Sequence, residues 1–183
     1  MKIKRKKFDQ HLYHEIEDEE KSEDYLDDAL PMIGHIVMHF NGLEKFLDAM
    51  ICEFFTDRTD STGLIVLHKM SYSSKVDLLK RFCDDFHIGI GREIGGFDGL
   101  VNNLKEAGRL RNLVVHADWE NTDDDGYTYV SLKLSKKGME QEYIQFSKES
   151  LEKIIEFILS LYEQLGSYDE EKDRIINNWS KST

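Results

Sequence analysis

Apolar residues recur at three- and four-residue steps along most of the chain, which is the spacing of helices with one buried face. The longest such segment begins near Ile33 and continues to Phe55. Polar or glycine-containing stretches separate it from shorter periodic segments downstream. The pattern predicts helices at about 33–55, 62–70, 72–89, 96–119 and from 148 onward, the last with a break or kink at Gly166.

The period changes to alternation in 127-YTYVSLKLS-135, which is also rich in Tyr and contains Thr and Val, so it predicts a strand. A turn at 136–138 leads to 139-MEQEYIQFS-147, the predicted partner strand. The two strands form a β-hairpin at about 127–147. Because an isolated hairpin is only marginally stable, we expect this one to pack on the helices.

The order of these elements predicts an all-α fold, an antiparallel helical bundle with one small β-hairpin inserted before the last long helix. A length of 183 residues is typical of one domain. We assign residues 30–179 to the helical domain and residues 1–29 to a charged N-terminal lead-in.

Capping chemistry predicts where several helices begin. Asp27 or Asp28 is expected to cap the first long helix, which places Pro31 in its first turn, where a missing amide hydrogen is tolerated. The other predicted caps are Ser73 or Ser74 for the helix at 72–89 and Ser147 for the last helix.

The net charge of −12 argues against a general nucleic-acid coat protein, since phosphate binding requires positive surface. It leaves room for a small basic site on an acidic body. It also fits a protein that binds, or is held by, a protein partner such as an antitoxin or regulator.

No apolar run approaches the roughly 18 residues that a membrane-spanning helix needs. The N-terminal segment is basic and then acidic, without the apolar stretch of a secretory signal. Cys52 and Cys83 lie in helical patterns without metal-type spacing. We therefore expect a cytoplasmic protein with reduced, buried thiols and no membrane association.

The stretch 109-RLRNLVVHADW-119 carries polar residues beside an apolar stripe. The stripe predicted to face the core is Leu110, Leu113, Val114 and Ala117. The polar residues on other sides of the same helix are Arg111, Asn112 and His116. Viewed around the predicted helix axis, an outward-facing apolar pair, Val115 and Trp119, lies between the directions of the arginine and the histidine. A helix with two such faces predicts a homodimer whose interface contains Val115 and Trp119.

Arg-Asn-x-x-x-His near the end of a late helix resembles the HEPN family, in which an arginine precedes a histidine by a few residues. Many members are metal-independent ribonucleases of toxin, phage-defence and CRISPR-associated systems. The resemblance covers about residues 30–165 in helix order and is specific at Arg111, Asn112 and His116.

The resemblance implies a homodimeric endoribonuclease that needs no metal or cofactor and cleaves RNA through attack of the 2′-hydroxyl group. His116 would transfer protons, Arg111 would stabilise the phosphate and Asn112 would orient these groups. Glu44 and Arg109 are candidate supporting residues. The candidates for guiding RNA to the site are Lys80, Arg81 and Lys105.

Other interpretations use the same residues. Arg111 and His116 are also typical of an ordinary exposed helix end, where a cation is favoured. The alternative function is a non-catalytic, dimeric helical interaction module. His35 and His39 have a spacing that can chelate zinc, but the sequence shows no third ligand, and no metal site is predicted.

Overall fold

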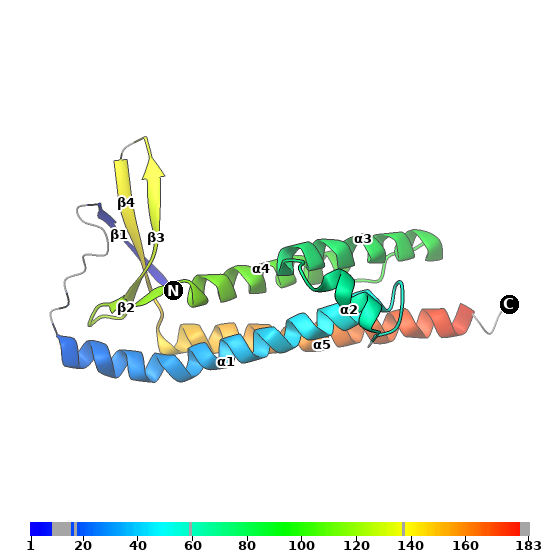
Figure 1. Cartoon of the computed structure of the whole chain (residues 1–183), viewed down its shortest axis with the longest axis horizontal. Helices are drawn as coiled ribbons and strands as arrows, with labels where there is room; N and C mark the ends of the chain where they lie inside the picture. Colours follow the sequence, from blue (N-terminus) through cyan, green and yellow to red (C-terminus); the bar gives the residue numbers. More distant parts are fainter. Residues whose placement is uncertain (9–15, 17, 59, 137, 180–183) are drawn as a thin grey trace. The chain divides into compact units, whose positions relative to one another are not determined.

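The computed structural model describes residues 1–8, 16, 18–58, 60–136 and 138–179 (Figure 1). Within these residues the chain forms five helices and four strands. The helices are α1 (Glu19–Cys52), α2 (Ser61–Leu67), α3 (Tyr72–Ile90), α4 (Phe97–Val115) and α5 (Lys148–Trp179). The strands are β1 (Lys2–Lys7), β2 (Asp118–Thr122), β3 (Tyr127–Ser135) and β4 (Gly138–Gln145).

The strands form one antiparallel sheet in the order β1-β4-β3-β2, so the predicted all-α fold class is wrong and the fold mixes helices with a sheet. The predicted hairpin is confirmed as β3 and β4, which pair from Tyr127 opposite Gln145 to Ser135 opposite Gly138. Periodicity does not predict the outer strands, because β1 is mostly lysine and arginine and β2 is mostly polar. Backbone pairing decides their conformation, that of β1 with the distant β4 and that of β2 with the neighbouring β3.

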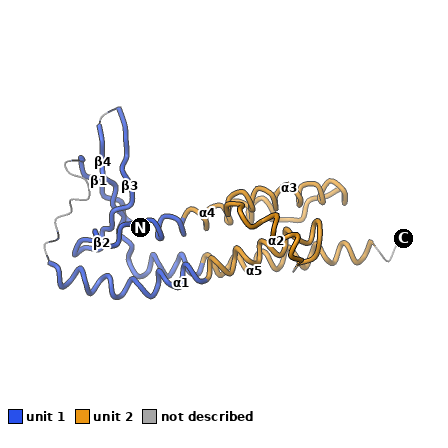
Figure 2. Tube along the Cα trace, in the orientation of Figure 1, with its two compact units in different colours: residues 1–38, 110–156 blue, residues 39–109, 157–183 orange. Residues whose placement is uncertain are grey.

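The described chain divides into two compact units (Figure 2). Unit 1 comprises residues 1–38 and 110–156, and it contains all four strands. Unit 2 comprises residues 39–109 and 157–183. The divisions therefore fall within the spans of α1, α4 and α5. The predicted lead-in at 1–29 and helical domain at 30–179 stay predictions.

Unit 1 buries one end of its sheet against its own helical segments. Ile144 and Phe146 are buried, and the Trp119 ring lies 5.1 Å from the Phe146 ring, measured between centroids. The hydroxyl of Tyr25, in α1, donates to the backbone carbonyl of Phe146. Position 126 requires glycine for two reasons: its φ is 80°, and a side chain there would overlap the Tyr25 ring.

Unit 2 buries the apolar stripes that periodicity predicts for its helices. The hydroxyl of Tyr162, in α5, donates to the backbone carbonyl of His39, in α1, at 2.8 Å. Gly42 leaves room for this hydroxyl, because a side chain at position 42 would overlap it. The predicted core residues that are buried here include Phe40, Leu43, Leu47, Met50, Ile51, Val76, Leu79, Ile158 and Leu165.

Helix α1 begins earlier than its predicted caps. It starts at Glu19, so Asp27 and Asp28 lie inside the helix, and the prediction that either one caps it is wrong. Pro31 is likewise inside α1 and not in its first turn. Proline cannot donate the amide hydrogen bond of a helix interior. The length of α1 therefore depends on the packing of its apolar face.

The remaining predicted helix ends differ in accuracy. Helix α3 is capped by Ser71, whose hydroxyl accepts from the Ser74 amide at 3.2 Å, so the predicted caps were placed two or three residues too late. Ser147 is confirmed at the start of α5, where its hydroxyl accepts from the Ser150 amide at 3.3 Å. Helix α5 continues through Gly166 without the predicted break.

Both cysteines are buried free thiols, which confirms the interpretation of Cys52 and Cys83 as reduced core residues. Burial raises the pKa of the Cys83 thiol to about 11, so that thiol stays protonated near neutral pH. In the part of the chain that the structure describes, no helix combines the length and the apolar character that crossing a membrane requires.

Candidate functional site

The end of α4 lies in unit 1 and carries the Arg-Asn-x-x-x-His motif. Leu110 and Val114 are buried, as the predicted core stripe requires, and α4 ends at Val115. The backbone amide of His116 still donates to the carbonyl of Asn112 at 3.0 Å, so His116 completes the last helical turn. The chain then turns directly into β2.

The three motif residues lie within the last two turns at this helix end. One terminal nitrogen of the Arg111 guanidinium donates to the side-chain oxygen of Asn112 at 3.0 Å. Asn112 thus accepts from Arg111 through its side chain and from His116 through its backbone. Asn112 and His116 are exposed and Arg111 is half-buried. The group can contact a ligand from solvent while Arg111 is held by its neighbour.

Trp119 does not lie on α4, so the helical geometry that assigns it to an outward-facing surface is wrong. It lies in β2, and its indole N–H donates to the Val114 carbonyl at 2.8 Å. That carbonyl is one of those left without a helical partner at the end of α4, so Trp119 helps to close the helix inside unit 1. Val115 is half-buried. The homodimer itself stays a prediction.

Glu44, the candidate supporting residue on α1, belongs to unit 2 and binds a lysine there. The buried Lys75 ammonium lies 2.8 Å from the Glu44 carboxylate and 2.9 Å from that of Asp48. Burial alone would lower the pKa of Lys75, but its hydrogen bonds to the two carboxylates raise it overall. Glu44 therefore neutralises a buried cation, and its role towards Arg111 stays a prediction.

Two of the three residues predicted to guide RNA, and the supporting candidate Arg109, are neutralised by nearby carboxylates. The pairs are Lys80 with Asp84 at 2.9 Å, Lys105 with Asp77 at 2.8 Å, and Arg109 with Glu106 at 2.7 Å. Arg81 is exposed. Because the pairs are largely exposed, each contributes little stability and can be displaced by another anion. They supply little net positive charge.

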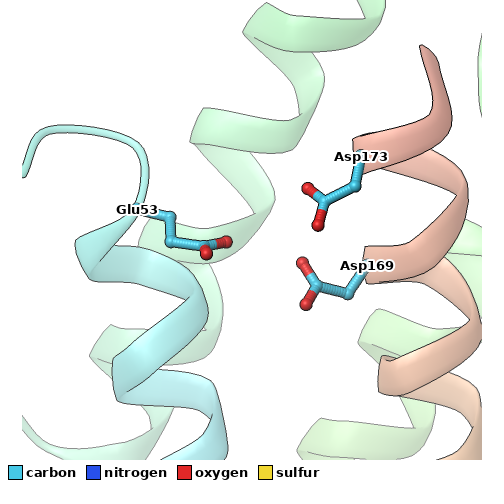
Figure 3. Close-up of side chains that lie close together, drawn as sticks. All are labelled: Glu53, Asp169 and Asp173. Carbon is cyan, nitrogen blue, oxygen red and sulfur yellow. The ribbon is translucent and has the colours of Figure 1, made fainter. Parts of the chain in front are cut away.

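One group of carboxylates in unit 2 has the spacing of a cation site. Ligand oxygens of Glu53, the residue directly after α1, and of Asp169 and Asp173 from α5 lie within 4.8 Å of one another (Figure 3). The buried Lys172 ammonium is 2.8 Å from Glu53 and 2.7 Å from Asp169. The guanidinium of Arg58 binds the same two carboxylates.

These two cations account for the carboxylate group without a metal ion. Burial acts to raise the pKa of Glu53 and of Asp169, but hydrogen bonds from Arg58 and Lys172 outweigh it and lower both values. We name the set Glu53, Arg58, Asp169 and Lys172 the ion-pair network. The sequence does not predict it, because only Asp169 and Lys172 are near neighbours along a helix.

A cavity of about 660 Å3 lies in unit 2 beside the start of α4. Its lining includes Arg92, which is 3.7 Å from Glu171, and two further glutamates, Glu93 and Glu163. The excess of negative charge does not suit an anionic ligand. We therefore assign the cavity no chemistry.

His87 is buried in unit 2 with an aromatic environment. Its Nε2 lies 3.1 Å from the Tyr168 hydroxyl, and its ring meets the edge of Phe97 at 5.1 Å between centroids. Burial lowers the pKa of His87, since the surroundings disfavour the charged imidazolium. Burial also raises the pKa of Tyr168, which therefore stays a neutral hydroxyl.

The lowered pKa of His87 predicts a pH-dependent stability. As pH falls below about 6.5, the ordinary pKa of histidine, the unfolded chain takes up a proton before the folded chain does, so the free energy of unfolding decreases. Urea unfolding above and below that pH should show a smaller decrease for His87→Gln. His68→Gln, which alters an exposed histidine of the same unit, should behave as wild type. An unchanged pH dependence in His87→Gln would contradict the assignment.

Comparison of the chain with protein-family models, with curated proteins and with solved structures found no match. Of the groups discussed above, the Arg111–Asn112–His116 group combines an exposed histidine, suited to proton transfer, with a half-buried arginine, suited to anion binding. The ion-pair network of unit 2 is internally neutralised.

Proposed function

We propose that the protein is a metal-independent endoribonuclease of the HEPN type, acting as a homodimer. The observation that supports the proposal is the group at the end of α4, in which a half-buried Arg111 donates to the Asn112 side chain and an exposed His116 follows Asn112 by one helical turn. The proposal extends to a toxin or phage-defence effector in the cytoplasm, controlled by an antitoxin or a regulatory protein.

The chemistry follows from the side chains present. The RNA 2′-hydroxyl oxygen bonds to the adjacent phosphorus while the bond from phosphorus to the 5′ oxygen breaks. The products are a 2′,3′-cyclic phosphate and a free 5′-hydroxyl. One histidine accepts the proton of the 2′-hydroxyl, and a second protonates the departing 5′ oxygen. In a homodimer each protomer contributes one His116 to this pair.

Arg111 stabilises the transition state in this scheme. Negative charge builds up on the phosphoryl oxygens during attack, and a guanidinium can bind two of them through parallel hydrogen bonds. Asn112 holds the guanidinium through the bond described above. DNA lacks the attacking 2′-hydroxyl and is not a substrate. Histidine serves because its ordinary pKa permits proton transfer in both directions near neutral pH.

The test is cleavage of a mixed RNA pool in the presence of EDTA by wild type, His116→Ala and His68→Ala. His68 is an exposed histidine in unit 2 and serves as the matched control. We expect wild type and His68→Ala to leave cyclic-phosphate ends, and His116→Ala to be about 10²–10⁴-fold slower.

Equal cleavage by all three proteins would rule out His116 as the catalytic group. Absence of cleavage by the folded wild type would instead favour the non-catalytic interaction module. The mass of each protein in solution, measured alongside, tests the proposed homodimer.

A further inference from the structure

One face of the sheet in unit 1 combines lysines with tyrosines. Side chains alternate between the faces of a strand, so Lys2, Lys4 and Lys6 of β1 point to the same face. The register places Lys4 opposite Tyr143 of β4, and Tyr143 opposite Tyr129 of β3. Strands β1, β4 and β3 lie side by side (Figure 1). We name this surface the lysine–tyrosine face; its residues are Lys2, Lys4, Lys6, Tyr127, Tyr129 and Tyr143.

The lysines on this face lie over the aromatic rings. The Lys4 ammonium is 5.0 Å from the centre of the Tyr127 ring, and the Lys6 ammonium is 5.7 Å from that of Tyr143. Tyr129 meets Tyr143 edge to face at 5.7 Å. Tyr143 is buried, whereas Tyr127 and Tyr129 keep part of their surface exposed. The lysines of β1 therefore lie at one edge of a face whose partly exposed rings belong to β3.

The opposite face of the same strands is electrostatically balanced. Arg5 lies 2.8 Å from the Glu142 carboxylate, and Lys133 lies 3.3 Å from it. Burial acts to raise the pKa of Glu142, but its bonds to these two cations lower it overall. On the lysine–tyrosine face Lys4 pairs with the Asp123 carboxylate at 3.5 Å, and this carboxylate also accepts from the Tyr127 backbone amide at 2.7 Å.

These strands carry a local excess of positive charge. Strands β1, β3 and β4 carry six basic and two acidic side chains, although the net charge of the whole chain is −12. Lysines on an edge strand also discourage pairing with other chains. That role needs no aromatic rings, and it leaves unexplained why three tyrosines of β3 and β4 lie on the same face as the lysines.

We propose that the lysine–tyrosine face binds single-stranded RNA. Lysine ammonium groups contact the phosphates, and the exposed parts of the Tyr127 and Tyr129 rings stack against unpaired bases, as aromatic rings do in other single-strand-binding sheets. The choice of RNA over DNA rests on the proposed function. The face belongs to unit 1, which also carries the Arg111–Asn112–His116 group.

The test measures binding of a fluorescein-labelled oligouridylate of about 12 nucleotides, a length within the site sizes of single-strand-binding folds. All proteins carry His116→Ala, so that the probe is not cleaved. Lys2→Gln with Lys6→Gln neutralises two lysines of the face and leaves the Lys4 ion pair intact. The matched control, Lys148→Gln with Lys153→Gln, removes two exposed lysines of α5 in the same unit.

We expect the β1 variant to bind on the order of tenfold more weakly than the α5 control. The slope of log affinity against log salt should fall by about 1.4, since each phosphate contact on a single strand contributes about 0.7. Tyr129→Leu should weaken binding at least about fivefold without changing this slope, because it removes stacking and no charge. Thermal melting confirms that each variant is folded.

Two results would overturn the proposal. The first is equal RNA affinity of the β1 variant and the α5 control. The β1 lysines would then serve only to discourage pairing of this edge strand with other chains. The second is equally tight binding of a duplex RNA of the same length, because paired bases cannot stack on the rings. Failure of the proposed nuclease function can be distinguished from failure of this binding proposal. In that case wild type does not cleave RNA, but binding of the oligouridylate to the lysine–tyrosine face persists.

Discussion

Arg111→Lys is expected to lower the rate of RNA cleavage by about 10²–10³-fold, the usual cost of losing one group that stabilises developing negative charge. Lysine keeps the positive charge. It cannot present the planar pair of donors that binds two phosphoryl oxygens, and it loses the guanidinium geometry that meets the Asn112 side chain at 3.0 Å. Single-turnover cleavage of a defined RNA at saturating enzyme measures the chemical step directly.

Arg174→Lys is the matched control for this prediction. Arg174 is an exposed arginine of α5 that pairs with Glu171, and its replacement should leave cleavage at the wild-type rate. If Arg111→Lys cleaved RNA as fast as Arg174→Lys, the arginine would have no special part in the reaction. Because Arg111 is half-buried, melting curves of both variants are needed to separate a lost chemical role from a lost fold.

Lys172→Met is expected to destabilise the protein by about 3–5 kcal/mol, the usual cost of removing one partner from a buried ion pair. Lys172 is 3% exposed and lies within hydrogen-bonding distance of both Glu53 and Asp169. Methionine fills a similar volume but leaves two partly buried carboxylates with Arg58 as their cation within the network. Urea unfolding at neutral pH measures the difference.

The pH dependence of this difference checks its cause. The folded chain holds the pKa values of Glu53 and Asp169 below those of the unfolded chain, so their contribution is full above a pH of about 4 and is lost as pH falls through the lowered values. The difference in the free energy of unfolding between wild type and Lys172→Met should therefore decrease at acid pH. Lys45→Met, at an exposed position of α1, should change stability by less than about 0.5 kcal/mol. A difference in the free energy of unfolding that is the same at all pH values would indicate that lost packing, and not lost ion pairing, causes the destabilisation.

Local periodicity was sufficient for the elements whose apolar face alone determines them. The helical stripe from Ile36 to Ile51 is buried, and the alternation after Tyr127 forms β3. Both patterns are properties of neighbouring residues, so they can be read without knowing what packs against them. The cap at Ser147 is equally local, since its partner is three residues away.

Long-range pairing decided what periodicity missed. Strand β1 has almost no apolar residues, and it is extended because its backbone pairs with β4, more than a hundred residues later. Strand β2 follows α4 directly, and Trp119 changes from an expected outer helix residue to the side chain that closes the helix end. The partner of β1 is far along the chain, whereas β2 pairs with the neighbouring β3 without an apolar pattern that would predict it.

The sequence by itself determined the spacing of Arg111, Asn112 and His116, because three residues within two turns of one helix have a relative geometry that the helix sets. Tertiary structure decided the rest of the electrostatic picture. It paired most of the predicted RNA-guiding cations with acidic neighbours and brought the lysines of β1 beside the tyrosines of β3 and β4. The net charge follows from the sequence by simple addition. The electrostatic potential at a surface depends instead on which charged side chains folding brings together.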